Sequence, residues 1–345
     1  MSPAAAAALR RRAGSRRLPG SLLIVLGLGA LALAAFASLV LGATAIAPTE
    51  AVAALVAFDG SAEHVAVAEV RLPRTAVALL VGASLGVAGA LMQAVARNDL
   101  ADPSILGISM GAALATVAGQ IVVGVDSAVL LVALAMGGAS VAAAAIVAVG
   151  LLGRGGFAAE RLVVAGAALS GLLLALVQGL LVIDRESLEA ARHWLAGTLT
   201  GAGWDDVAAT LPYLAVGAVI ATAITRPLTT LGLGDDVASA LGVRPRPVQA
   251  ATAVAIVALA GASVALAGPI ALVGLAVPHA ARALVGRDIG PQLVACSVLG
   301  ALLVVVSDIA ARVLLAPEEL PVGVVTAIVG APVLLHVARR RTHRP

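Results

Sequence analysis

The chain alternates long, uncharged apolar stretches with short segments that carry its charges. A bilayer core of about 30 Å needs roughly 20 apolar residues per helix, and most of these stretches have the length of one span. Residues 247–281 are longer, and Gly268-Pro269 interrupts them, so we expect two short spans that meet at a turn. The uncharged stretches are 18–49, 75–96, 103–125, 127–153, 162–183, 207–225, 247–281, 289–307 and 320–338. Together they predict ten transmembrane helices, and their continuous rather than alternating apolar character excludes a transmembrane barrel.

Composition agrees with this pattern and narrows the class of protein. Of the 345 residues, 61% are hydrophobic and 12% are charged, which is too little charge to cover a soluble domain of this length. The sequence therefore predicts an all-α polytopic membrane protein. The net charge of +3 comes from arginines that flank apolar runs, so we expect no nucleic-acid partner.

The side chains available for chemistry are few. All 22 basic residues are arginine, which excludes a Walker A loop because that loop needs a lysine for the phosphates. If ATP drives this protein, ATP and Mg bind on another chain. The single cysteine, Cys296, lies in an apolar run and excludes a disulfide framework. The five histidines have no metal-ligand spacing, so we expect no metal and no cofactor on this chain.

Charge asymmetry orients the predicted helices. An even number of spans places both termini on one side, and a cytoplasmic location assigns 17 arginines to the inner side and five to the outer side, as the positive-inside rule favours. We expect a basic tail at 1–20, one transmembrane domain at 21–338 with a cytoplasmic loop at 226–247, and a basic tail at 339–345. Residues 1–47 could also mimic a secretory signal, but their apolar run favours a retained first helix.

Arg71 and Arg74 fall on the outer side in this topology. Arg71 lies at an expected helix start, with Pro73 in the first turn, where the helix dipole disfavours a cation. Two general preferences are violated at one place, which indicates a functional role. The alternative is a pair of interfacial arginines that Glu63 and Glu69 partly neutralise.

A second charged pair lies inside the predicted ninth span. Asp308 and Arg312 are four residues apart with the acid first, the favoured order on a helix. An acid within a span is costly unless it is paired, so we interpret the two residues as a structural pair. Glu318 and Glu319 follow closely and could also neutralise Arg312.

The segment between the sixth and seventh spans has the pattern of a short cytoplasmic helix. Asp235 and Asp236 follow Gly234, where acids favour a helix start, and Gly242 can close the helix. The segment is either a docking point for a partner or a solvated connector.

Glycine and proline mark two further features. Gly268, Pro269, Gly274 and Pro278 predict broken helices of the kind that line transport paths. Asp102-Pro103-Ser104 resembles a helix start, and Gly107 with Gly111 has a spacing that suits close helix packing. The pattern GASxxxAG occurs in both 82–107 and 261–286, as an inverted repeat would produce, although chance is a serious competitor in so glycine-rich a chain.

These segments, in this order, resemble the FecCD-type permeases, the membrane subunits of binding-protein-dependent ABC importers for iron–siderophores, haem and vitamin B12. The resemblance runs from about Val67 to Arg340. It rests on RLPR at Arg71–Arg74, GALMQ at Gly89–Gln93, RNDLADPSILGISMGA at Arg97–Ala112, WLAGTL at Trp194–Leu199, LGVRP at Leu241–Pro245, AGPIALVGLAVPHAAR at Ala267–Arg282, SDIAAR at Ser307–Arg312 and EELPVGVVTAIVGAP at Glu318–Pro332.

The resemblance implies a vitamin B12 permease-like fold of ten helices and a set of partners. Two permease subunits, identical or paralogous, would form the pathway above two cytoplasmic ATPase subunits and below a periplasmic or lipid-anchored binding protein. The binding protein would present acids to Arg71, Arg74 and Arg312. The ATPase contact would comprise Gly234, Asp235, Asp236, Ala240, Leu241 and Gly242. The pathway or gate candidates are Gln93, Asn98, Ser109, Gly268, Pro269, Gly274 and Pro278.

The sequence departs from the family pattern at Asp99, where proline is usual, and at Ala271 and Leu272, where glycine and a bulky aromatic are usual. We expect a non-enzymatic permease in a bacterial cytoplasmic membrane that carries a ferric siderophore or related chelate. Haem and vitamin B12 are alternative cargoes. An ion-coupled secondary transporter is a rival, and only Asp308 with Arg312 offers it a coupling site.

Overall fold

The structure is a computed structural model that describes residues 20–342, except 105–106, 126, 153–158 and 184–193. Every regular element among these residues is helical. The helices are α2 (Gly20–Val40), α3 (Pro48–Val56), α4 (Ala62–Val65), η1 (Ala66–Arg71), α5 (Leu72–Val95), α6 (Ile108–Ala118), η2 (Gly119–Val123), α7 (Ala128–Leu152), α8 (Ala159–Ile183), α10 (Trp204–Ala223), α11 (Thr225–Leu231), α12 (Asp235–Ala240), α13 (Pro245–Ala267), α14 (Val273–Val285), α15 (Ile289–Val313) and α16 (Val322–Thr342).

The number of membrane-spanning helices agrees with the sequence pattern. Within the described residues, 7 helical stretches are long and apolar enough to cross a membrane. Three shorter apolar helices, at Ile108–Val123, Val273–Val285 and Val322–Pro332, account for the remaining predicted spans. The protein is therefore an all-helical, multi-pass membrane protein.

Helix α5 is the centre of the bundle, and glycines let its neighbours approach closely. It packs on α15, α13 and α14. A Cβ placed at Gly82 would lie 2.3 Å from the carbonyl oxygen of Gly300 on α15, and one at Gly89 would lie 2.0 Å from that of Gly274 on α14. Real side chains cannot occupy these positions, so the backbones themselves form the contact.

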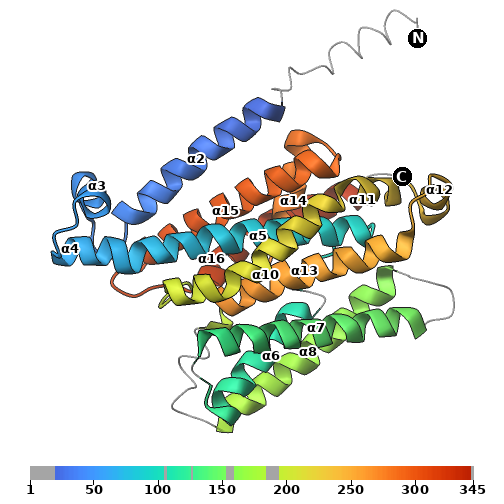
Figure 1. Cartoon of the computed structure of the whole chain (residues 1–345), viewed down its shortest axis with the longest axis horizontal. Helices are drawn as coiled ribbons and strands as arrows, with labels where there is room; N and C mark the ends of the chain where they lie inside the picture. The colour runs from blue at the N-terminus through green and yellow to red at the C-terminus, as the bar shows by residue number, and fades with distance from the viewer. Residues whose placement is uncertain (1–19, 105–106, 126, 153–158, 184–193, 343–345) are drawn as a thin grey trace, which may run out of the picture.

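The arrangement of the helices agrees with an inverted repeat. Both α5–α8 and α13–α16 contain a long helix, a short helix and two long helices. Helix α5 packs on α14 and α15, and α13 packs correspondingly on α6 and α7. Figure 1 shows α5 running from the end with α3 and α4 toward the end with α12, while α13 runs the opposite way. The equivalence is not exact, because Gly89 lies within α5 whereas Gly268 ends α13.

Three predicted boundaries were wrong. The expected short span before Gly268 is α13, a full span of 23 residues. Asp102-Pro103-Ser104 forms a turn, and α6 begins only at Ile108. Arg71 does not start a helix, because α4, η1 and α5 form one helical run from Ala62 to Val95. The unfavourable dipole inferred for Arg71 is therefore absent.

Candidate functional site

Of the five arginines predicted on the outer side, Arg185 and Arg192 lie outside the described residues. The other three, Arg71, Arg74 and Arg312, lie where the end of α2 meets α5 and α15. Their relative exposures are 8%, 6% and 3%. All three guanidinium groups bind within the chain rather than pointing into solution. Glu63 and Glu69, the acids expected to neutralise two of them, are exposed side chains.

Arg71 and Arg312 cap the C-terminal end of α2. Arg71 donates from Nη1 to the carbonyl oxygens of Leu39 and Val40 at 2.8 and 2.9 Å, and from Nη2 to Thr44 O at 2.6 Å. Arg312 donates from Nη1 to Ser38 O at 3.1 Å. The last carbonyls of a helix lack intrahelical donors, and the helix dipole favours cations there. Both arginines therefore satisfy the end of the first span.

Arg74 holds two carboxylates at once. Its Nε donates to Asp308 Oδ1 at 2.9 Å, and its Nη1 donates to Glu319 Oε2 at 2.9 Å and Oε1 at 3.2 Å. Arg312 pairs with the other oxygen of Asp308, with Nη2 2.9 Å from Oδ2. That contact is electrostatic rather than a hydrogen bond, because Asp308 Oδ2 accepts no hydrogen bond of good geometry.

The resulting outer ion network contains Arg71, Arg74, Arg312, Asp308 and Glu319. Three cations and two anions leave a formal charge of +1. The predicted pair of Asp308 and Arg312 is present, but the sequence did not reveal its link to Arg74. Glu319, which the sequence suggested as a neutralising partner of Arg312, forms its ion pair with Arg74.

The other end of the bundle carries the predicted cytoplasmic helix. Helix α12 follows Gly234, which has a φ of 112°, and precedes Gly242 at 83°, so both glycines occupy backbone conformations that other residues avoid. Asp235 and Asp236 are exposed in the first turn. Arg97 pairs with Asp235 and donates to Leu231 O at 2.7 Å, which joins the loop after α5 to this helix.

Three apolar side chains beside α12 face outward. Leu233, Val237 and Leu241 are 65%, 47% and 63% exposed. They are spaced by four residues, and Ala238 provides the buried contact to the bundle. Apolar side chains at this spacing form one stripe along the segment.

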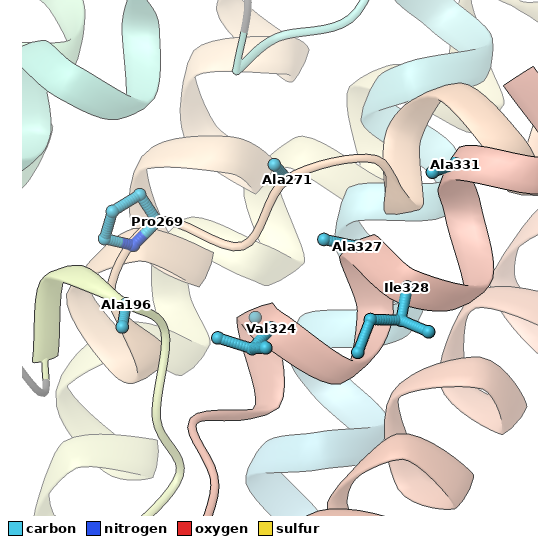
Figure 2. Close-up of a pocket in the computed structure, with 8 residues that line it drawn as sticks. Ala196, Pro269, Ala271, Val324, Ala327, Ile328 and Ala331 are labelled. Atoms are coloured by element: carbon cyan, nitrogen blue, oxygen red, sulfur yellow. The ribbon is translucent and has the colours of Figure 1, made fainter.

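An open apolar pocket of about 510 Å³ lies between α16 and two connecting segments. Its lining includes Ala196, Pro269, Ala271, Val324, Ala327 and Ile328. Figure 2 shows the Val324 and Ala327 side chains of α16 on the side of the turn that carries Pro269 and the segment that carries Ala196. The lining contains no charged side chain, so it offers no fixed charge for a ligand.

The seven predicted pathway residues do not form one site. Pro269 lines the pocket, and Gly268 lies against the carbonyl of Trp194. Gln93 donates from Nε2 to Gly274 O at 3.2 Å, which ties α5 to α14. Asn98 stabilises a turn by accepting from Leu100 N. Ser109 and Pro278 are buried within helices.

The departures from the expected pattern have defined surroundings. Asp99 lies 3.8 Å from Arg282 and 3.5 Å from Arg287, which connects the loop after α5 to the last turn of α14 and to the α14–α15 connection. Ala271 lines the pocket. Leu272 has a φ of 69° and packs against Gly330 of α16.

Comparison with proteins of known sequence places the chain among iron-chelate and cobalamin permeases. It is 42% identical over 304 residues to the probable siderophore transport system permease protein YfiZ of Bacillus subtilis (strain 168), covering 88% of this chain and 91% of the relative. It is 39% identical to the ferric enterobactin transport system permease protein FepD of Escherichia coli (strain K12), covering 94% and 95%. A cobalamin import system permease protein, BtuC of Halobacterium salinarum, is 39% identical, covering 81% and 75%.

A solved structure described as an inward-facing conformation of a metal-chelate type ABC transporter matches with a TM-score of 0.80 and 27% identity. The match covers 93% of this chain and 99% of that chain. The profile of the FecCD transport family matches residues 30–340. These matches cover most of the chain, and the chain belongs to the FecCD transport family.

Proposed function

We propose that this chain is the membrane permease subunit of an ATP-driven importer for a ferric siderophore or a related iron chelate. The relatives named for siderophore and enterobactin transport support this cargo. The cobalamin relative keeps a corrinoid as the alternative. ATP and Mg bind on a pair of cytoplasmic ATPase subunits, and a second permease subunit completes the pathway.

The exposed stripe of Leu233, Val237 and Leu241 carries the ATPase part of this proposal. Burial of a Val or Leu side chain contributes roughly 1.5–3 kcal/mol, so an uncovered row of three beside a capped helix favours a protein partner. The acids Asp235 and Asp236 at the helix start add a polar rim. We propose that the ATPase binds the Gly234–Gly242 segment. Movement of this segment would then reach α5 through the contacts of Arg97.

Substitution of this stripe tests the contact. Val237→Asp with Leu241→Asp should abolish co-purification of the ATPase with the permease, because two charges would have to be buried without partners. Leu314→Asp is the control, since Leu314 is 66% exposed beyond α15 at the opposite end. Retention of the ATPase by the double variant, at the level of the control, would refute the coupling contact.

The outer network supports docking of an extracytoplasmic binding protein at Arg74. Arg71 and Arg312 are committed to the end of α2, whereas the carboxylate that Arg74 holds on its outward edge, Glu319, is partly exposed. We therefore propose that Arg74 is the docking cation and that Arg71 and Arg312 position the surrounding backbone.

The network also argues against the ion-coupled rival. Asp308, the carboxylate that the sequence offers to this rival, is fully buried between Arg74 and Arg312. Both of its oxygens face arginines, so Asp308 is committed to a structural ion network. Uptake by the reconstituted complex should therefore require ATP and the binding protein. Uptake driven by an ion gradient without the ATPase would overturn the proposal.

A further inference from the structure

The two carboxylates on Arg74 differ in how easily another anion could replace them. Asp308 has no exposed surface and is also paired with Arg312, whereas the Glu319 side chain is 30% exposed. Exchange of Glu319 leaves the buried pair intact. Exchange of Asp308 would strand a buried cation, which is far more costly.

Glu319 joins Arg74 to a second part of the molecule. Its Oε2 accepts a hydrogen bond from Thr200 Oγ1 at 2.9 Å. Thr200 belongs to the segment 194–203, which precedes α10 and contributes Ala196 to the apolar pocket. One carboxylate therefore bridges the charged network and the rim of the pocket.

The segment 194–203 is held against the pocket by backbone contacts. Thr198 N donates to Ala267 O at 2.9 Å, and Gly323 N donates to Gly197 O at 3.0 Å. These bonds join the segment to the end of α13 and the start of α16. The Thr200–Glu319 bond is an additional side-chain tie that links the position of this segment to the occupancy of Arg74.

We infer that Glu319 is a resident competitor for the docking site: a carboxylate of the binding protein displaces it from Arg74, and the displaced Glu319 releases Thr200 and loosens the pocket rim. This inference rests on the proposed docking at Arg74. One carboxylate replaces another at the same guanidinium edge, so the exchange needs no unpaired charge. Burial raises the pKa of Glu319, but Arg74 and Thr200 lower it by more than burial raises it. The pKa of Glu319 therefore lies below its ordinary value. Glu319 is therefore ionised at neutral pH.

Variants that remove one negative charge, made in the assembled complex, test whether Glu319 competes with the binding protein for Arg74. Glu319→Gln in the permease–ATPase complex should increase affinity for the binding protein about twofold to fivefold, the range that a partly exposed ion pair supports. Glu318→Gln is the matched control, because it removes the same charge from an exposed neighbour. Equal effects of the two substitutions, or weaker binding by Glu319→Gln, would overturn the inference.

A thiol probe tests the release of the segment. The native cysteine, Cys296, is buried, so Ala202→Cys provides a reporter on the segment 194–203. Thr200→Val should speed maleimide labelling of this reporter and should raise binding-protein affinity slightly, because it removes a bond that docking otherwise breaks. The binding protein should speed labelling in the parent but not in Thr200→Val. A labelling rate that responds neither to Thr200→Val nor to the binding protein would refute the release of the segment 194–203.

A separate variant distinguishes this inference from the docking proposal. Arg74→Gln removes the proposed docking cation, leaves Asp308 paired with Arg312, and should abolish docking in a complex that still retains the ATPase. Unchanged docking would refute Arg74 as the docking cation. Lost docking in this variant, combined with equal affinities for Glu319→Gln and Glu318→Gln, would refute only the competition.

Discussion

Arg71 illustrates how the fold assigns a role that its sequence neighbourhood conceals. Next to Pro73 it resembles a cation misplaced at a helix start, but it lies within a continuous helical run and reaches across to the end of α2. Its planar fork binds several carbonyl oxygens at once, which a lysine could not reproduce with the same geometry. The position therefore combines a favourable helix dipole with satisfied hydrogen bonds.

Removal of this cap should loosen the first span. Arg71→Gln removes the guanidinium donor from the carbonyl oxygens of Leu39 and Thr44, whereas Val40 O keeps a donor in Ile46 N. An unsatisfied buried acceptor costs about 1–3 kcal/mol. We expect a lower thermal unfolding midpoint for the variant in detergent. Arg246→Gln, which changes an exposed arginine in the first turn of α13, is the control and should be within about 0.5 kcal/mol of the parent. Equal midpoints for the two variants would contradict the capping role.

Local spacing predicted one pair of this network and could not predict the rest. Asp308 and Arg312 are four residues apart, so helical periodicity alone brings them together. Arg74 is separated from Asp308 by 234 positions and from Glu319 by 245. Such contacts depend on which helices are neighbours, and that information is not contained in the spacing of charges within one segment.

At the scale of helices, glycine sets the distance between α5 and its neighbours. Without a hydrophobic driving force between helices in lipid, close van der Waals packing holds the bundle together. The contacts of Gly82 with Gly300 and of Gly89 with Gly274 place backbone against backbone. A side chain at either contact must push two helices apart.

Gly89→Ala should therefore destabilise the bundle despite the better helix propensity of alanine. The new Cβ would lie 2.0 Å from Gly274 O, and overpacking costs typically about 1–3 kcal/mol. Gly137→Ala is the matched control, because a Cβ at that position in α7 meets nothing within 4 Å, and it should be neutral or stabilising. Thermal unfolding of both variants in detergent measures the difference. A stabilised Gly89→Ala would show that the α5–α14 contact is looser than described.

Uncharged stretches predicted the existence of the spans better than their ends. Apolar length alone locates a helix in lipid, which is why ten spans could be counted from the sequence. Boundaries depend on tertiary contacts: Asp102 accepts from Ser104 in a turn, so α6 starts later than the Asp-Pro-Ser pattern indicates. Likewise, α13 extends up to Gly268 as a full span, since packing on α5 supports the whole helix.

At the scale of the whole molecule, α16 has an apolar face beside the pocket. Ile328 is 66% exposed and lines the pocket together with Val324 and Ala327. In an isolated subunit this pocket is open on one side and does not form an enclosed pathway. We propose that a second permease subunit faces it and completes a smooth apolar conduit, which would not retain cargo through charge.

Cross-linking in the assembled importer tests this arrangement. Ile328→Cys should give a permease–permease product with a short bis-maleimide if the second subunit is an identical copy, because the two α16 faces would meet near the two-fold axis. If it is a paralogue, the product should instead join Ile328→Cys to a cysteine introduced at the aligned position of that subunit. Leu33→Cys on α2, 70% exposed, is the control and should remain uncross-linked. A cross-linked control with an unreactive Ile328→Cys would place the subunit interface on α2 instead and leave the pocket facing lipid.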